Sequence, residues 1–102
     1  MSSLEFETEP VAVEVEVTED ELIVRLVDGR RIIVPLVWYP RLFYARPEER
    51  QRWRLLGGGY VIEWPDLDEH IGVEGLLAGR KSGESEESLR RWLVSRRTTV
   101  AV

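Results

Sequence analysis

The chain has 102 residues, a formal net charge of −5 and no cysteine. This length predicts one domain with a single hydrophobic core, which leaves little room for a deep catalytic cleft. The absence of cysteine excludes disulfides, thiolate metal sites and cysteine nucleophiles. The acidic total argues against non-specific nucleic-acid binding. Apolar runs are too short to span a bilayer and the N-terminal residues lack a signal-peptide pattern, so we expect a soluble cytoplasmic protein without membrane contact.

The first third of the chain predicts an antiparallel three-stranded meander. Residues 1–9 are polar and acidic, and we expect a flexible segment there. Valines alternate with small or acidic residues over 11–17, which is the period-2 pattern of a half-buried strand. Residues 22–27 and 30–36 predict the next two strands. Asp28-Gly29 between them is typical of a type I′ hairpin turn, and Pro35 places the end of the third strand at a sheet edge.

Prolines and glycines then divide the middle of the chain. Pro40 and Pro47 each suit the first turn of a short helix, which predicts helices over 40–45 and 47–55, with Trp53 as the apolar anchor of the second. The triple glycine at 57–59 is expected to end that helix and to turn the chain into a strand over 60–64.

The remaining segments are less regular. Residues 65–70 predict a loop and 73–77 a helical turn. Residues 80–84 read as a linker, and Ser85 is a good N-cap for a helix from Glu86 to about Arg97. Its apolar stripe is Leu89, Trp92 and Leu93. Residues 98–102 favour a strand but are too few to place, and the basic residues expected on the open faces of the helix are Arg90, Arg91, Arg96 and Arg97.

These elements predict an α+β fold, in which a small antiparallel β-meander carries short helices and a C-terminal helix. A helix of twelve or so residues is marginal alone in water. It must therefore dock on its own domain, on a second copy or on a partner, and we expect Trp92 to be its anchor. We interpret this helix as an interaction element.

One cluster has chemical potential: Glu63, Asp66, Asp68, Glu69 and His70. Carboxylates beside a histidine could ligate a divalent metal or perform acid–base work. Their spacing matches no calcium or zinc motif, and the chain has no second histidine. No serine lies in a nucleophile elbow, and the triple glycine lacks the context of a phosphate loop. We therefore predict no catalytic residue, no metal site and no cofactor.

Aromatic and arginine residues are numerous in the middle and at the end of the chain. Four tryptophans are present, and tryptophan, tyrosine and arginine are the residues that dominate protein interfaces. The competing interpretation is that the aromatic residues form the core and that the arginines are solvated. The candidate interaction residues are Trp38, Tyr39, Arg41, Trp53, Arg54, Trp92 and Arg96.

Two longer strings are specific. Residues 36–42 read LVWYPRL, and residues 64–77 read WPDLDEHIGVEGLL. With the Asp28-Gly29-Arg30 turn and the triple glycine, they resemble an uncharacterised family of short bacterial proteins, domain of unknown function 2442. The resemblance covers roughly residues 10–79 and leaves residues 80–102 as a linker and C-terminal helix. Arg46 departs from it, because the family usually has threonine or serine there as an N-cap.

The resemblance implies an α+β fold and no known activity. It also implies pairing with small neighbouring proteins, in arrangements similar to toxin–antitoxin pairs. We therefore interpret the chain as a non-enzymatic protein-interaction module, antitoxin-like, with a protein partner from a neighbouring gene. The acidic charge suits masking of a basic partner. The alternatives are a DNA-binding regulator that uses the arginine-rich final helix and a small metal-dependent enzyme that uses the carboxylates of 63–70. Self-association also stays open.

Overall fold

The computed structural model of the chain describes residues 9–100, with side chains to Arg96, and confirms an α+β fold. Within this part, six strands form two antiparallel three-stranded sheets. The first sheet has the order β1-β2-β3 and the second the order β4-β5-β6. Short helices connect the strands, and a long C-terminal helix, α4 (Glu86–Val100), follows the second sheet. The predicted segment 1–9 lies almost entirely outside the described residues.

The first sheet is the predicted meander. It comprises β1 (Ala12–Val17), β2 (Glu21–Leu26) and β3 (Arg31–Pro35), with β2 in the centre. Alternate residues of these strands are buried, because a period of two places every second side chain on the core side. A bulge between Ala12 and Glu14 exposes both Val13 and Glu14. Pro35 lies on an edge strand, as predicted.

The β2–β3 hairpin has a different turn from the predicted one. A type I′ turn requires positive φ at both central residues, but only Gly29 has it, with φ 96°. The amide of Leu26 donates to the carbonyl of Arg30 at 2.7 Å, which leaves three residues in the loop. The side chain of Asp28 accepts from the amide of Arg30 at 3.0 Å. A three-residue loop that ends in a left-handed glycine therefore replaces the type I′ turn.

The second predicted helix is much shorter than expected. After the 3-10 helix η2 (Leu36–Trp38), helix α1 covers Pro40–Phe43 and helix α2 covers Pro47–Arg50. Residues 54 and 55, expected at the end of the second helix, belong instead to strand β4 (Arg54–Leu56). Pairing of this segment with the next strand supplies its backbone hydrogen bonds, so the long-range ladder prevails over local helix propensity.

The second sheet contains one predicted strand and two unpredicted ones. Strand β5 (Val61–Trp64) lies between β4 (Arg54–Leu56) and β6 (Glu69–Gly72). The predicted loop over 65–70 was therefore wrong. It consists of the 3-10 helix η3 (Pro65–Leu67), a left-handed residue at Asp68 with φ 52°, and the start of β6.

The triple glycine joins β4 to β5, and not a helix to a strand. All three glycines have positive φ. At Gly59 an added Cβ would lie 2.5 Å from the carbonyl oxygen of Ala12, and the Gly59 carbonyl accepts from the Ala12 amide at 2.8 Å. Only glycine permits this approach, which links the turn of the second sheet to the first strand of the first sheet.

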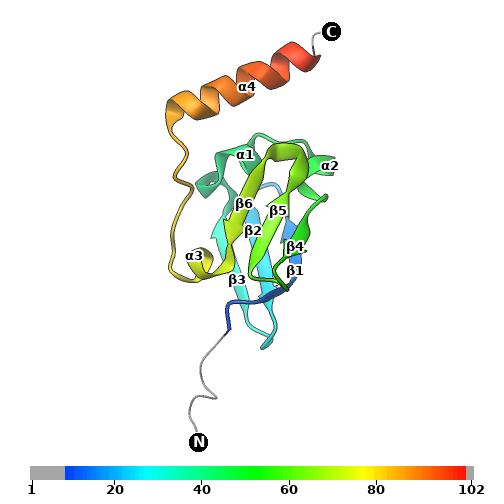
Figure 1. Cartoon of the computed structure of the whole chain (residues 1–102), viewed down its shortest axis with the longest axis vertical. Helices are drawn as coiled ribbons and strands as arrows, with labels where there is room; N and C mark the ends of the chain where they lie inside the picture. Colours follow the sequence, from blue (N-terminus) through cyan, green and yellow to red (C-terminus); the bar gives the residue numbers. More distant parts are fainter. Residues whose placement is uncertain (1–8, 101–102) are drawn as a thin grey trace, which may run out of the picture.

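The two sheets lie one in front of the other, with helices α1 and α2 at one end (Figure 1). Their inner faces share one core, in which Trp64 is the largest fully buried side chain. The indole Nε1 of Trp64 donates to the carbonyl of Arg50 at 3.1 Å, so the core also holds the end of α2. Helix α3 (Val73–Leu77) follows β6 as predicted and buries Val73 and Leu76.

Helix α4 crosses the α1–α2 end of the domain, after a segment that runs along the side of the molecule (Figure 1). The predicted N-cap is present, because the Ser85 hydroxyl accepts from the Ser88 amide at 3.1 Å. The helix continues to Val100, beyond the predicted end near Arg97. Residues 98–100 are therefore helical and not β, and residues 101–102 lie outside the described part.

Replacement of Trp64 by alanine should reduce the free energy of unfolding by about 3–5 kcal/mol, because it leaves a cavity and removes a buried hydrogen bond. Urea unfolding followed by circular dichroism measures this loss. Tyr60→Ala in the same segment is the control and should cost far less, since Tyr60 is 46% exposed. A loss below about 1 kcal/mol for Trp64→Ala would contradict the role given to the indole.

Candidate interaction site

Most of the predicted interaction residues lie where the C-terminal segment meets the domain. Three of them, with two carboxylates, form what we call the docking cluster: Arg41, Glu49, Glu84, Trp92 and Arg96. These residues come from α1, from α2, from the segment before α4 and from α4 itself. The cluster therefore joins parts of the chain that are far apart in sequence.

Arg41 on α1 holds the segment before α4. Its Nε and Nη2 donate to the Glu84 carboxylate at 3.0 and 2.6 Å, and its Nη1 donates to the Leu67 carbonyl at 3.0 Å. Both charged side chains are largely buried, at 15% and 10% exposed. The hydrogen bond from Arg41 lowers the pKa of Glu84 below its ordinary value, against the opposing effect of burial. A bidentate pair of this kind fixes direction as well as distance.

Two guanidinium groups lie over the Trp92 ring. The Cζ of Arg41 is 5.1 Å from the centre of the indole ring, and that of Arg96 is 4.5 Å from it. Contacts of this type stabilise by roughly 0.5–2 kcal/mol, depending on solvent exposure. Trp92 also packs against the hydrophobic core. The predicted anchor of the helix thus contacts its own domain.

Arg96 makes the second ionic contact of the helix. Its Nη2 and Nη1 donate to the two carboxylate oxygens of Glu49 at 2.6 and 3.2 Å. Glu49 is only 4% exposed. Burial raises the pKa of Glu49, but the hydrogen bonds from Arg96 and from the Arg46 amide outweigh it and lower the pKa overall. The prediction that Arg96 stays on an open face was wrong, whereas Arg90 and Arg91 are exposed; the Arg97 side chain lies outside the described part.

Glu49 also explains how α2 begins without a Ser or Thr cap. Its side chain accepts from the Arg46 amide at 2.9 Å, which is half of a capping box. The Arg46 guanidinium cannot accept a hydrogen bond and instead lies 3.3 Å from Glu49 as a cation. One carboxylate therefore caps α2 and binds α4.

Trp38 and Tyr39 hold the segment that leads to α4. The buried Tyr39 hydroxyl donates to the Arg80 carbonyl at 2.7 Å, and the Ser82 amide donates to the Trp38 carbonyl at 3.0 Å. The Lys81 ammonium lies 5.3 Å from the centre of the Trp38 ring. Residues 80–84, predicted as a linker, are therefore bound to the domain along their length.

The other two predicted interaction residues lie elsewhere. Trp53 is half-buried and packs on the core between α2 and β4. Arg54 is exposed on the second sheet, where it forms an ion pair with Glu63. The structure thus groups Trp38, Tyr39, Arg41, Trp92 and Arg96 and leaves Trp53 and Arg54 apart.

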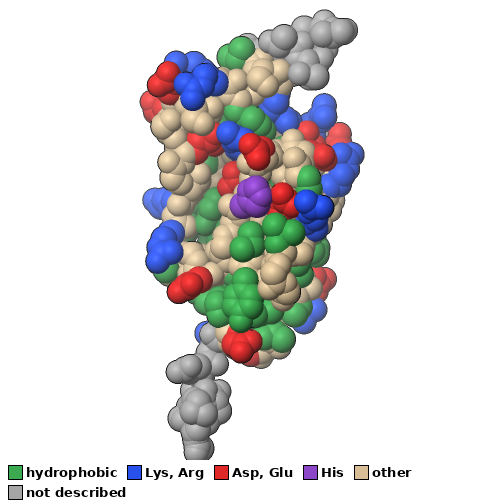
Figure 2. Space-filling view, viewed as in Figure 1, with side chains coloured by type: hydrophobic (Ala, Val, Ile, Leu, Met, Phe, Trp, Pro, Cys, Tyr) green, Lys and Arg blue, Asp and Glu red, His purple; other side chains and the backbone are tan. Residues whose placement is uncertain are grey.

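The acidic cluster of 63–70 is dispersed. Arg54, Glu63 and His70 form one row across the outer face of the second sheet, with His70 Nε2 3.0 Å from Glu63. Figure 2 shows the chain's one histidine in purple on this face, with acidic and basic side chains beside it. Asp66 pairs with Arg52 at 2.6 Å instead. Among the described residues no group of three His, Asp or Glu is placed to hold a metal ion.

Glu69 differs from its neighbours because it has no ion pair among the described residues. With Tyr39, His70 and Arg80 it lines an open depression of about 280 Å³. Burial raises the pKa of Glu69 to about 7, opposed by Arg41 and reinforced by the negative charge of Glu84. Near neutral pH this carboxyl group is therefore half protonated.

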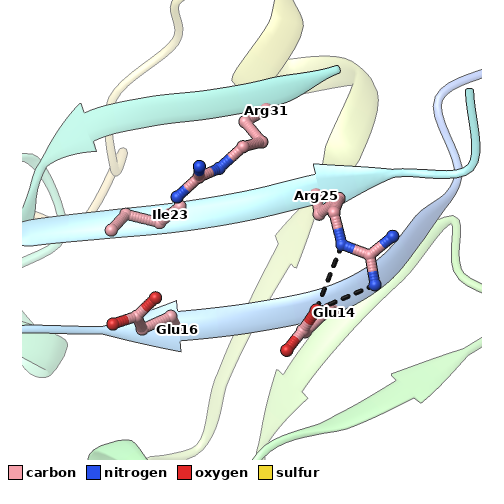
Figure 3. A pocket seen from close by; sticks show the side chains of 5 residues that line it. All are labelled: Glu14, Glu16, Ile23, Arg25 and Arg31. Atoms are coloured by element: carbon pink, nitrogen blue, oxygen red, sulfur yellow. Dashed lines mark hydrogen bonds and ion pairs between the residues drawn. The ribbon is translucent and has the colours of Figure 1, made fainter. Parts of the chain in front are cut away.

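The outer face of the first sheet carries a second depression, of about 310 Å³ (Figure 3). It is lined by Glu14, Glu16, Ile23, Arg25 and Arg31. The prediction of interaction residues missed this face, because it considered aromatic residues first. The period-2 alternation of the strands would have predicted this face, since the same alternation that buries the valines exposes these charged side chains.

Comparisons with known proteins agree with the fold. The model of a family described as "Protein of unknown function (DUF2442)" matches residues 12–82. A protein of unknown function from Rhodospirillum rubrum superimposes with a TM-score of 0.64 at 27% identity, covering 74% of this chain and 94% of that one. An uncharacterised protein from Chromobacterium violaceum gives a TM-score of 0.62 at 20% identity, covering 86% and 78%. No curated protein matches the sequence, and no helix within residues 9–100 could cross a membrane.

Arg96→Ala should release α4 from the domain. The change leaves the buried Glu49 with Arg46 as its cation and should lower the free energy of unfolding by about 2 kcal/mol. Hydrogen exchange should show loss of protection in α4 while β2 and β5 keep theirs. Arg91→Ala is the matched control, because Arg91 is exposed and its ion pair among the described residues is with Glu87 on the same helix. Equal protection of α4 in both variants would contradict this account.

Glu69 should make the protein less stable as pH rises from 5 to 8. Its folded pKa of about 7 lies above the ordinary 4.5, so the unfolded chain loses the proton first and folding is disfavoured across that window. The loss is on the order of 2 kcal/mol. Urea unfolding at pH 5, 6, 7 and 8 measures it, and Glu69→Gln should flatten the profile. The exposed Glu74→Gln should keep the wild-type slope, and a fall that persists in Glu69→Gln would exclude Glu69 as its source.

Proposed function

We propose that this chain, which belongs to the DUF2442 family of proteins of unknown function, is a non-enzymatic protein-interaction module. Its acidic β1–β2 hairpin binds a basic protein partner. It thereby acts as the antitoxin-like member of a two-protein system, in which an acidic domain masks a cationic surface.

The unequal neutralisation of charge supports this proposal. Within the described residues, many carboxylates pair with an arginine, as Glu49, Glu63 and Glu84 do. The carboxylates without such a pair are most concentrated on the β1–β2 hairpin. Four of its carboxylates have no ion pair with any described residue: Glu16, Glu19, Asp20 and Glu21. Unpaired charges of one sign produce a local negative potential that attracts cationic ligands and accelerates their association.

The hairpin tip is also held in a defined shape. The Thr18 hydroxyl accepts from the amides of Asp20 and Glu21 at 3.3 and 3.0 Å. The Leu36 amide donates to the Asp20 carbonyl at 2.9 Å, and the Gln51 side chain donates to the Val17 carbonyl at 3.3 Å. Because the backbone is already ordered, a partner would not have to supply the free energy of ordering it.

A basic protein fits this surface better than a nucleic acid does. The hairpin carboxylates repel phosphates and attract lysine and arginine. The exposed arginines of α4, Arg90 and Arg91, are the feature that favours the DNA-binding alternative. Arg91 already pairs with Glu87 at 3.1 Å, which reduces the positive potential of that face.

Charge reversal at the hairpin tests the proposal. The tagged full chain and the variant Glu19→Lys/Glu21→Lys would be purified from the native host. The matched control Glu74→Lys/Glu86→Lys makes the same change in net charge at exposed residues of α3 and α4. We expect a stoichiometric basic protein with the wild type and the control, bound at least about tenfold more weakly by the hairpin variant.

Three outcomes would contradict the proposal. One is the absence of any stoichiometric protein in the wild-type purification. Another is equal retention of the partner by the hairpin variant and the control. A third is co-purification of nucleic acid that is lost in Arg90→Glu, which would instead support the DNA-binding alternative.

A further inference from the structure

On the outer face of the first sheet, acidic and basic side chains lie on different strands. The register places Glu14, Arg25 and Arg31 side by side in one row, and Glu16, Ile23 and Ile33 in the next. The β1 side of this face is therefore acidic, and the β3 side is basic. The two isoleucines lie between them, and Ile33 is 53% exposed. Figure 3 shows the side chain of Arg31 extended across β2 toward Ile23, opposite Glu16.

Only part of this charge is neutralised within the chain. Arg25 pairs with Glu14 at 2.8 Å. Glu16 on β1 and Arg31 on β3 form no ion pair with any residue between 9 and 96. Each of the two edge strands thus carries one uncompensated charge, and the two charges are opposite in sign.

We propose that this face is the interface of a homodimer, in which two copies of the chain pack their first sheets face to face. A two-fold axis that lies in the interface, along or obliquely across β2, places β1 of each copy over β3 of the other. Because a two-fold contact is reciprocal, Glu16 of each copy meets Arg31 of the other, which gives two such ion pairs. The isoleucines of β2 and β3 form the apolar centre between the two ion pairs.

Self-complementarity identifies the occupant as a second copy. An acidic half, an apolar middle and a basic half match their own image across such an axis, whereas a uniformly charged partner would be attracted by one half and repelled by the other. The hairpin tip at Glu19 and Asp20 lies beyond these rows. Glu16 also belongs to the acidic hairpin of the proposed function, whereas Arg31 and Ile33 lie on β3, outside that hairpin. Loss of the dimer in Arg31→Glu is therefore distinguishable from loss of the basic partner in Glu19→Lys/Glu21→Lys.

The size of the face predicts a weak dimer. Three strands of about six residues span roughly 20 by 14 Å, which is less than the area per partner of a standard stable interface and corresponds to a weak, transient contact. The dimer should form at high protein concentration and should weaken as salt screens the ion pairs.

Sedimentation equilibrium of the purified full chain, from about 5 to 500 μM, measures the association. We expect a monomer–dimer equilibrium for the wild type. The single charge reversals Glu16→Arg and Arg31→Glu should each weaken it at least about tenfold, because each places like charges opposite each other. The double variant Glu16→Arg/Arg31→Glu should dimerise like the wild type, since the same pairs form with exchanged signs. Arg90→Glu on α4 is the control and should not change the equilibrium.

Mixing the two single variants gives an independent readout. The chains Glu16→Arg and Arg31→Glu should form a heterodimer, since position 16 of each chain then faces a residue of opposite charge at position 31 of the other. One pair is the native Glu16 with the native Arg31, and the other joins the two substituted residues. Circular dichroism of each variant shows whether the fold is retained. A wild-type chain that stays monomeric at 500 μM would overturn the proposal. So would a double variant as weak as the singles, or single variants that dimerise as tightly as the wild type.

Discussion

The guanidinium group of Arg41 determines where the last part of the chain lies. One planar group binds the Glu84 carboxylate through two nitrogens, caps the Leu67 carbonyl with a third and covers one face of Trp92. Lysine has neither the fork of donors nor the flat surface that these contacts need. Because Arg41 itself is fixed by α1, the position of α4 follows from the position of a helix only four residues long.

Local patterns of the sequence predict the elements whose stability is mainly local. The meander follows from period-2 alternation, strand β5 from the β-prone residues after the triple glycine, and the cap at Ser85 from capping preference. Strands β4 and β6 could not be predicted from local patterns. Strand β4 has only three residues, and neither strand shows a clear alternation of apolar and polar residues. They are strands because each pairs with β5. Long-range pairing of this kind prevails over local propensity and is not visible in one sequence.

The interaction residues illustrate the same limit. Residue type alone selected Arg41, Trp92 and Arg96, and the structure brings them together. Residue type alone does not identify their partners, because Glu84 and Glu49 are 43 and 47 residues away from the arginines that they bind. Alternation in the sequence predicts which residues of the first sheet face outward. Their arrangement depends on the strand register, which places acidic β1 and basic β3 on opposite sides of Ile23.

The wide sequence separation of the docking contacts has a consequence for the order in which the molecule folds. Both sheets are complete by Gly72 and the buried core by Leu76, and the strands of each sheet pair as hairpins between neighbours in the chain. Contacts between near neighbours form before those that must close long loops. The two sheets can therefore form before α4 docks, and in that interval Glu49 has Arg46 as its cation among the described residues. When α4 docks, Arg96 binds Glu49 and completes this site. The helix therefore binds to a surface that has already folded.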